Sequence, residues 1–311
     1  MRILVVGAGA IGGYFGGRLL QAGCDVSFLV RAQRAATLAK TGLVIKSATG
    51  DFARPAPPTI LAEDLREPFD LILLSVKAYD LDGAIASFAS AVGSQTAILP
   101  LLNGMRHLDI LDQRFGPDRV LGGQCLIAAT IGKDGAILHL NQDHALSFGE
   151  RDGSRSERIE AIAAAMSGAA FDSRASERIL QEMWEKWVFL AALAGSTCLM
   201  RAAIGDIAQS PGGTDFVLAL FDECRAIAVA SRHAPREVLV ARSCGALTAR
   251  GSTLTASMLR DIENRAPIEA DHILGDLLRR APQPDAAPLS LLHLAYAHLK
   301  AYEARRQREA R

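Results

Sequence analysis

At 311 residues the chain is long enough for two domains. Half of its residues are hydrophobic and 22% are charged, which is typical of a globular protein with sizeable cores. Its 34 basic residues balance 34 acidic ones, so no net field would draw the chain to nucleic acid or to an anionic membrane, and we expect neither as a partner.

The five cysteines lie far apart and form no CxxC pair, so we expect no metal site and no disulfide framework. Unpaired thiols are usual in reducing compartments, which favours a cytoplasmic location. The opening apolar run, Ile3–Val6, is shorter than the core of a signal peptide and fits a strand better. The longest apolar stretch, Trp187–Met200, is about fourteen residues, which is too short to span a bilayer.

The first half of the chain alternates short β-branched runs with segments of helical periodicity. This alternation is typical of βαβ units and predicts an α/β domain with a Rossmann-type doubly wound sheet. Two later runs alternate with turn signals such as Asp134-Gly135, and we expect them to complete that sheet as antiparallel strands. The predicted strands are Ile3–Val6, Val26–Val30, Leu71–Val76, Ala97–Leu99, Val120–Leu121, Ile137–Leu140 and Leu146–Phe148.

From about Ser173 helical periodicity replaces the strands. We therefore predict an all-helical C-terminal domain over residues 171–311, after the α/β domain of residues 1–170. Its first helix is long and largely apolar, so we expect it to be buried. The predicted helices are Glu177–Leu199, Asp215–Ser231, Pro235–Leu247, Ser257–Ile262, Ile268–Arg280 and Leu289–Arg306, with a break at Pro282–Pro284 before the last.

A GxGxxG motif follows the first predicted strand directly. It opens a helix rich in small residues, and a second strand follows at the spacing of a βαβ unit, so the context agrees with the motif. Such a loop needs glycine for a tight turn, for close approach of the backbone to a diphosphate, and for helix–strand packing. We expect this loop to bind a dinucleotide through Gly7, Ala8, Gly9, Ala10, Ile11 and Gly12.

The end of the second strand indicates which dinucleotide is bound. NAD-specific folds place an acid there for the ribose hydroxyl, whereas NADP-specific folds place an arginine there for the 2′-phosphate. Here the strand ends at Arg31, with Arg34 one helical turn further on, and no acid lies nearby in the sequence. We therefore expect NADP(H), with Arg31 as the main phosphate contact and Arg34 as its assistant.

Polar residues also follow the next two strands of the predicted sheet. Lys77 comes after Leu71–Val76 and Asn103 after Ala97–Leu99, at the carboxyl edge where such sheets bind ligands. In the helical domain, Lys186 lies inside an apolar helix, which is costly unless the lysine faces a site or extends its amine to water. Lys186 is thus a candidate general acid, although a lysine paired with a neighbouring glutamate would look the same.

The last helix contains Tyr296 and Lys300, which match the YxxxK dyad of short-chain dehydrogenases. The glycine spacing of the loop differs from that of this class, and the pair lies in the wrong domain. We interpret both residues as part of a surface helix rather than as a catalytic dyad.

Taken together, the motifs resemble the ketopantoate reductase (2-dehydropantoate 2-reductase) family over nearly the whole chain. The order and spacing of separate segments carry the resemblance. These are the glycine loop, Arg31, Ser75–Lys77, Leu102–Met105, Trp184–Trp187, Ala256–Ile262 and Pro267–Asp271.

The resemblance implies NADPH-dependent reduction of a 2-oxo acid, namely 2-dehydropantoate to pantoate in pantothenate biosynthesis. It implies that Lys186 is the general acid, since hydride transfer leaves negative charge on the carbonyl oxygen, which an ammonium can stabilise and protonate. Lys77 and Asn103 would flank the nicotinamide and the substrate. Ser257 would contact the substrate carboxylate, and Glu269, the second catalytic residue, would reach the cofactor or the substrate hydroxyl.

The sequence departs from the family pattern where asparagines usually line the substrate site. Leu190 and Ala194 stand four and eight residues after Lys186, and no asparagine lies near Gly205-Asp206. A site with fewer hydrogen-bond donors prefers a less polar substrate, so a paralogue acting on another 2-oxo acid remains an alternative. A non-catalytic NADP-binding sensor is a second one, against which Lys186 and Glu269 argue. The helical domain is compatible with a homodimer and with a monomer.

Overall fold

The computed structural model describes residues 1–282 and 290–310, and the chain divides into two compact units. The first comprises residues 1–102 and 107–180, and the second comprises residues 103–106 and the chain from Gln181 onward. The sequence places the boundary near residue 170, but β10 (Asp172–Ala175) pairs with β9 (Ile137–Gly149) and keeps the next residues in the first unit. The proline break predicted before the last helix runs into residues 283–289, outside the described residues.

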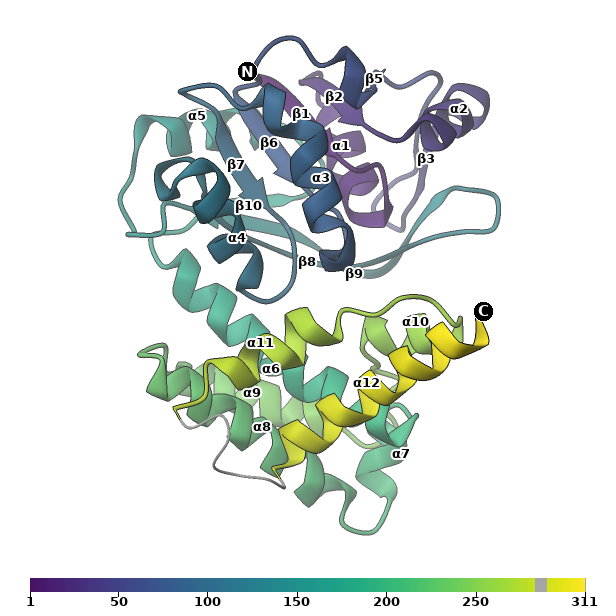
Figure 1. The fold of residues 1–311 in the computed structure, drawn as a ribbon, viewed down its shortest axis with the longest axis vertical. Coiled ribbons are helices and arrows are strands. Elements are labelled where there is room, and N and C mark those ends of the chain that lie inside the picture. The colour runs from purple at the N-terminus through teal and green to yellow at the C-terminus, as the bar shows by residue number, and fades with distance from the viewer. Residues whose placement is uncertain (283–289, 311) are drawn as a thin grey trace. The chain divides into compact units, whose positions relative to one another are not determined.

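A parallel sheet in the order β5-β2-β1-β6-β7 forms the centre of the first unit (Figure 1). Its inner strands are nearly continuous runs of buried apolar residues, as expected of a parallel sheet covered on both faces. They are β1 (Arg2–Val6), β2 (Asp25–Leu29), β5 (Thr59–Ile60), β6 (Leu71–Leu74) and β7 (Ala97–Pro100). The unit also contains α1 (Ala10–Gln21), α2 (Ala32–Thr41), α3 (Leu81–Phe88), α4 (Arg106–Phe115), α5 (Glu157–Met166), and the short turns η1 (Ala62–Asp64), η2 (Ala78–Asp80), η3 (Ala89–Ala91) and η4 (Pro117–Arg119).

A second sheet corrects the prediction for the later strands. The two runs expected to complete the first sheet form one strand, β9, which pairs antiparallel with β8 (Gly122–Ile131). β9 also pairs with β3 (Leu43–Lys46), which in turn pairs with β4 (Phe52–Arg54). Alternation along the sequence predicts a strand but not its partner, so this second sheet was missed. The predicted strand at Val120–Leu121 is reduced to a bridge between Ile98 and Val120.

Helix α1 packs against residues of both sheets, and its glycines make the close approach feasible. A Cβ atom on Gly16 would lie 2.6 Å from the ring of Phe28 in β2, and one on Gly13 would lie 2.4 Å from Ile137 in β9. The same helix begins at the glycine loop. Its packing therefore fixes the position of the loop that the sequence assigns to the dinucleotide.

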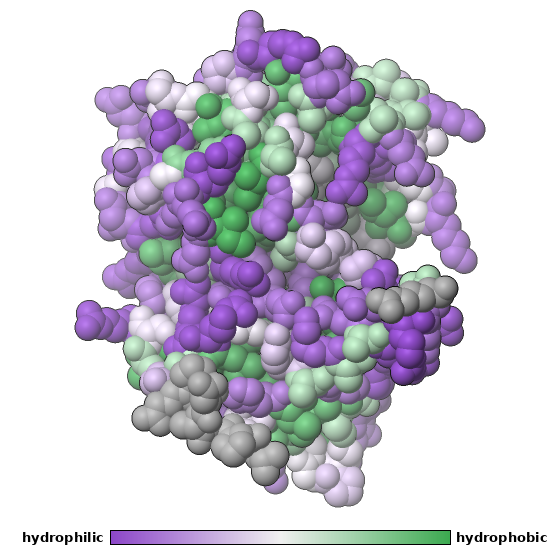
Figure 2. All heavy atoms as spheres, in the orientation of Figure 1, coloured by the Kyte–Doolittle hydropathy of each residue, from purple (hydrophilic) through white to green (hydrophobic). Residues whose placement is uncertain are grey.

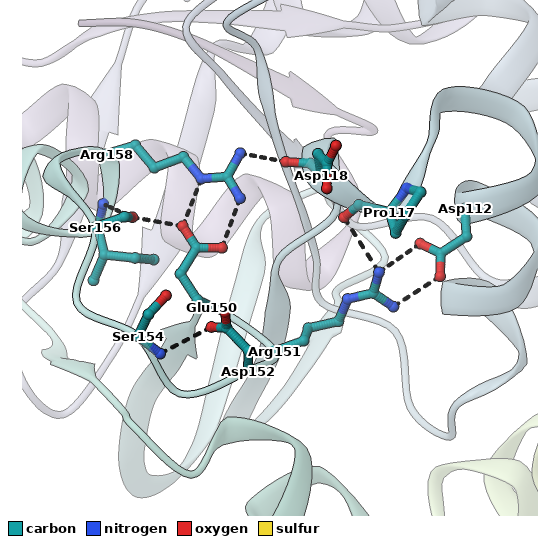
Figure 3. A network of polar contacts seen from close by, with 10 residues as sticks. Asp112, Pro117, Asp118, Glu150, Arg151, Asp152, Ser154, Ser156 and Arg158 are labelled. Atoms are coloured by element: carbon teal, nitrogen blue, oxygen red, sulfur yellow. Dashed lines mark hydrogen bonds and ion pairs between the residues drawn. The ribbon is translucent and has the colours of Figure 1, made fainter.

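A network of ion pairs and hydrogen bonds lies where β9 ends in the first unit (Figure 3). The guanidinium of Arg158 binds both oxygens of Glu150 at 2.6 Å, and Ser156, the N-cap of α5, donates to the same carboxylate at 2.5 Å. Arg151 makes a second two-pronged pair with Asp112 of α4, at 2.8 and 2.9 Å. These bonds tie the end of β9 to α4 and to the start of α5.

The described part of the second unit contains helices and no strand, so the predicted fold class, a Rossmann-type α/β domain followed by an all-helical domain, is confirmed. The segment predicted as one helix, Ile268–Arg280, contains a π-helical turn, η5 (Asp271–Gly275), followed by α11 (Asp276–Arg279). The other helices are α6 (Ile179–Met200), α7 (Ile204–Gln209), α8 (Gly213–Ala230), α9 (Glu237–Leu247), α10 (Ser257–Glu263) and α12 (Leu291–Glu309).

Hydrophilic side chains cover much of the face drawn in Figure 2, with apolar patches between them. The strongly exposed apolar side chains include Leu126 and Leu140 of the β8–β9 pair and Val238 of α9. Within the described residues, none of the helices has both the length and the apolar character that crossing a membrane requires.

Candidate functional site

The glycine loop connects β1 to α1 in a conformation that depends on its glycines. Gly7 has a φ of +92°, in the region that side chains rarely adopt, and its N–H donates to the carbonyl of Leu29 at 3.0 Å. A Cβ on Gly12 would lie 2.1 Å from both the carbonyl oxygen of Gly7 and the hydroxyl of Ser75. A Cβ on Gly9 would meet no atom within 4 Å, so this part of the loop borders open space.

The N-terminus of α1 has the features of an anion-binding site. Gly9 is its N-cap and supplies no side-chain cap, and the first turn holds no acidic residue. The first N–H groups of a helix have no partner within the helix, and the helix dipole favours negative charge there. The loop and helix terminus therefore fit the diphosphate of a dinucleotide.

The two predicted phosphate-binding arginines have different surroundings. Arg31 is exposed and forms an ion pair with Asp80 at 2.7 Å. Arg34 is partly buried, and its Nε donates to the carbonyl of Ala8, inside the glycine loop, at 3.1 Å. Its Nη2 is buried and has no hydrogen-bond partner within the described residues, and burial lowers the pKa of this side chain. A buried, unsatisfied cationic donor beside the loop fits a phosphate better than the exposed pair does.

Asp80 is an acid that sequence reasoning missed near this site. It lies 49 residues after Arg31, at the end of η2, so no local pattern connects the two. The ion pair raises the pKa of Arg31 through its hydrogen bond and charge interaction with Asp80. Arg31 must therefore share its charge between this carboxylate and any phosphate.

The strand ends that carry Lys77 and Asn103 lie next to each other, because Leu74 of β6 is paired with Pro100 of β7. Lys77 is half-buried and is the N-cap of η2. Asn103, however, belongs to the helical unit together with residues 104–106. That Lys77 and Asn103 both line the site therefore stays a prediction.

Lys186 lies in α6 next to Glu185, whose carboxylate forms an ion pair with Arg236. The carboxylate of Glu185 is 2% exposed and accepts from Arg236 at 2.6 and 2.8 Å. Burial alone would raise the pKa of Glu185, but its hydrogen bonds with Arg236 and Gln181 hold it below the ordinary value. Glu185 therefore has its counter-ion from outside α6, and the half-buried Lys186 is not needed to neutralise it.

The π-helical turn η5 connects the surroundings of three predicted site residues within the helical unit. The carbonyl of Glu269 accepts from the N–H groups of His272 and Ile273, at 3.2 and 3.0 Å. The indole N–H of Trp187, the neighbour of Lys186, donates to the carbonyl of Ile273 at 2.9 Å. π-Helical turns are rare in proteins, and those that occur often lie at functional sites.

The third connection of this turn runs through His272 to Asn103. The buried imidazole hydrogen-bonds the backbone of Asn103, and burial lowers its pKa despite the opposing charge of Glu269. A Cβ on Gly104, whose φ is +80°, would lie 3.0 Å from the carbonyl of His272. The structure thus places the backbones of Asn103 and Glu269 and the indole of Trp187 around one turn. Sequence reasoning missed His272, and no pattern marks it beyond its place after the Pro267–Asp271 motif.

Ser257 is tied to the other half of α6. It is the first residue of α10 and is exposed, and the N–H of the preceding Ala256 donates to the hydroxyl of Thr197 at 3.4 Å. Thr197 lies about three helical turns after Lys186. This bond ties the backbone just before Ser257 to the C-terminal half of α6.

The face of α6 that follows Lys186 is apolar, as the sequence indicates. Residues four and eight positions apart share a helix face, and here these are the half-buried Leu190 and the buried Ala194. The hydroxyls of Ser196 and Thr197 donate to carbonyls of the same helix, at 2.7 and 2.6 Å, so they add few free donors.

The start of α7, at Gly205 and Asp206, also lacks a replacement for the usual asparagine. A Cβ on Gly205 would lie 2.4 Å from the backbone of Ser252, so the position has no room for a side chain. The carboxylate of Asp206 accepts from the N–H of Ala203 and caps α7. Neither residue offers an amide to a substrate.

Comparisons with known proteins show which family the chain is similar to. The family model "Ketopantoate reductase PanE/ApbA" matches residues 3–153, and its C-terminal counterpart matches residues 178–303. The uncharacterized oxidoreductase YkpB of Bacillus subtilis is 37% identical over 305 residues, which are 98% of this chain and 99% of the relative. The structure of 2-dehydropantoate 2-reductase from Methylococcus capsulatus has a TM-score of 0.84 at 31% identity, over 98% of each chain. D-Mandelate dehydrogenase, solved with NADH and anilino(oxo)acetate, has a TM-score of 0.85 at 20% identity, over 99% of each chain.

The fold is that of an oxidoreductase built from a Rossmann-type unit and a helical unit. Within that class, the chain belongs to the ketopantoate reductase family, because the two family models together cover most of its length.

Proposed function

We propose that the protein reduces a 2-oxo acid with NADPH, with Lys186 as the general acid. The observation that carries the proposal is the η5 turn, which holds Glu269, Asn103 and the neighbour of Lys186 in one place. The contacts join the backbones of Glu269 and Asn103 and the indole of Trp187 to one rare π-helical turn, and the three segments carry a carboxylate, an amide and a lysine, the groups that a site for a carbonyl and a carboxylate needs.

The first unit supplies the groups for the cofactor. The glycine loop and the N-terminus of α1 hold the diphosphate, and Arg34, with Arg31, holds the 2′-phosphate. Lys77 lies at the carboxyl edge of the same sheet, where it lines the nicotinamide end. When bound, NADPH supplies a hydride to the carbonyl carbon of the substrate.

The second unit supplies the groups for the substrate. The ammonium of Lys186 stabilises the negative charge that develops on the carbonyl oxygen and gives it a proton from Nζ, which yields the 2-hydroxy acid. Ser257 and Asn103 bind the substrate by hydrogen bonds, and Glu269 accepts from the substrate hydroxyl or a cofactor ribose. Each of these roles is carried over from the family by matching position.

For the substrate we propose 2-dehydropantoate first, which would place the enzyme in pantothenate biosynthesis in the cytoplasm. The apolar face at Leu190 and Ala194 favours a second candidate, a 2-oxo acid with a less polar side chain. The shared fold of D-mandelate dehydrogenase, solved with anilino(oxo)acetate, is compatible with such a ligand.

The test is a steady-state assay of NADPH oxidation against a panel of 2-oxo acids. The panel contains 2-dehydropantoate, branched aliphatic 2-oxo acids and an aromatic one, each measured also with NADH. Turnover of 2-dehydropantoate with the highest kcat/KM supports the first candidate, and preference for a branched or aromatic acid supports the second. Tight binding of NADPH without turnover of any member would contradict the proposal and favour a sensor.

A further inference from the structure

Two residues of α12 hold the carboxylate of Asp271, the first residue of the η5 turn. The hydroxyl of Tyr296 donates to one oxygen at 2.6 Å, and the ammonium of Lys300 donates to the other at 2.9 Å. Tyr296 and Lys300 are four residues apart and therefore lie on one face of the helix. These are the residues that match a YxxxK motif, and the structure gives them a partner 25 and 29 residues away.

The clamp, meaning Asp271, Tyr296 and Lys300, is built into the helical unit. Figure 1 draws α12 passing the segment around α11, and α12 contacts the η5 turn. A Cβ on Gly275, the last residue of the turn, would lie 3.0 to 3.1 Å from the ring and hydroxyl of Tyr296. Glycine thus lets the tyrosine lie flat against the turn while its hydroxyl reaches Asp271.

The charges in the clamp are stabilised by each other. Burial alone would raise the pKa of Asp271, but hydrogen bonds from Tyr296 and Lys300 lower it. Burial alone would lower the pKa of Lys300, but hydrogen bonds to Glu303 and Asp271 raise it above its usual value. The carboxylate and the ammonium therefore both stay charged at neutral pH, which makes their hydrogen bonds strong.

The turn that the clamp holds is the one that touches the proposed catalytic groups. Glu269 contributes its carbonyl to the turn, the carbonyl of Ile273 accepts from Trp187 beside Lys186, and His272 binds the backbone of Asn103. A π-helical turn is intrinsically less stable than an α-helix and needs contacts outside itself to persist. Tyr296 and Lys300 supply such contacts at Asp271, the first residue of the turn.

We propose that Tyr296 and Lys300 are positioning residues, which hold Asp271 and so set the geometry of the η5 turn and of the groups bound to it. They do not act on the substrate themselves, because both of their polar ends are engaged with Asp271. This inference rests on the proposed function for its catalytic consequence, but its structural part can be tested without a substrate.

The experiment compares Tyr296→Phe, Lys300→Met and Lys300→Arg with two matched controls on the same helix. Tyr302→Phe removes a hydroxyl that donates to the carbonyl of Ala266 at 2.8 Å, and Arg305→Met removes an exposed cation paired with Glu309. Each variant is assayed for kcat and KM with the 2-oxo acid that the wild type reduces best. Affinity for NADPH and melting temperature are measured in parallel.

A spectroscopic reading reports on the turn directly. The chain has two tryptophans, Trp184 and Trp187, so a Trp184→Phe background leaves the indole that donates to Ile273 as the sole tryptophan. Its emission wavelength depends on that hydrogen bond. The same clamp variants and controls are introduced into this background.

We expect Tyr296→Phe and Lys300→Met to lower kcat about tenfold, because small misplacements of catalytic groups cost that much or more. The emission of Trp187 should shift, NADPH affinity should stay at the wild-type value, and Lys300→Arg should recover most of the activity. Variants that melt earlier but keep wild-type kcat, KM and emission would overturn the inference, since the clamp would then only stabilise the fold. If the wild type reduces no 2-oxo acid, the proposed function fails, and unchanged emission in the variants would still refute the positioning role.

Discussion

Replacing Arg34 with methionine should weaken NADPH binding more than the same change at Arg31, although Arg31 lies nearer the end of β2. Arg34 donates to the carbonyl of Ala8 in the glycine loop, and its Nη2 is buried without a partner within the described residues. Arg31 is 80% exposed and already paired with Asp80. We therefore predict the opposite ranking of the two arginines to the one that the sequence favours.

The magnitudes follow from these surroundings. A hydrogen bond to a charged group contributes about 1.5 to 3 kcal/mol, so losing one from Arg34 to the 2′-phosphate should raise Kd about 10- to 100-fold. An exposed ion pair contributes up to about 1 kcal/mol, so Arg31→Met should raise Kd up to about fivefold. Without cofactor, Arg34→Met loses the bond to Ala8 but also removes an unsatisfied buried nitrogen, so its melting temperature should stay close to that of the wild type.

Calorimetric titration with NADPH and with NADH measures both effects. Affinity for NADH, which lacks the 2′-phosphate, should change little in either variant. Equal losses for NADPH and NADH in Arg34→Met would mean that the variant distorts the glycine loop rather than removing a phosphate contact. A larger loss of NADPH affinity in Arg31→Met than in Arg34→Met would refute the reasoning.

Three further predictions concern the loop, the fold and the substrate face. Gly12→Ala should abolish measurable binding of NADPH in the same titration, since the new Cβ would lie 2.1 Å from the loop carbonyl of Gly7 and force the turn open. Glu150→Gln should lower the free energy of unfolding by about 1 to 3 kcal/mol at neutral pH in urea titrations, because Arg158 loses a charged partner. Leu190→Asn should raise kcat/KM for 2-dehydropantoate relative to that for a branched aliphatic 2-oxo acid, because it restores a donor on the face that follows the lysine.

The Glu150 prediction has a defined pH dependence and a control. Burial alone would raise the pKa of Glu150, but the hydrogen bonds from Arg158 and Ser156 hold this pKa below its ordinary value. A lowered folded-state pKa gives stability that is complete above the unfolded-state pKa, about 4.3, and is lost as the pH falls through the folded-state value. The gap between wild type and variant should therefore close in acid. Glu67→Gln, which removes an exposed pair with Arg2, should show little effect at any pH.

Local patterns predicted the first sheet and the glycine loop because their information is local. The GxGxxG motif, the strand before it and the helix after it are contiguous. The positive φ of Gly7 is a local requirement of the turn between them. The second sheet depends on pairs such as Ile45 with Ile137, which no local window contains. The π-helical turn also escaped, because its apolar spacing over a few residues differs little from that of an α-helix.

At the site, the sequence identified residue types but not their partners. The resemblance singled out Lys186 and Glu269, yet Tyr296 and Lys300, which hold the neighbouring turn through Asp271, lie 25 and 29 residues from their partner in the chain. Tyr296 and Lys300 were noticed by spacing and interpreted as a plain surface helix. Their role could not be predicted, because it depends on which carboxylate the folded chain places opposite them.

The measurement that tests the central claim most directly is the turnover of Lys186→Ala with NADPH and the best 2-oxo acid of the wild type. Loss of a positioned proton donor should lower kcat about 10²-fold or more, while the affinity for NADPH stays unchanged, and the exposed Lys133→Ala should behave as the wild type. A Lys186→Ala enzyme that reduces the acid at the wild-type rate would contradict the account.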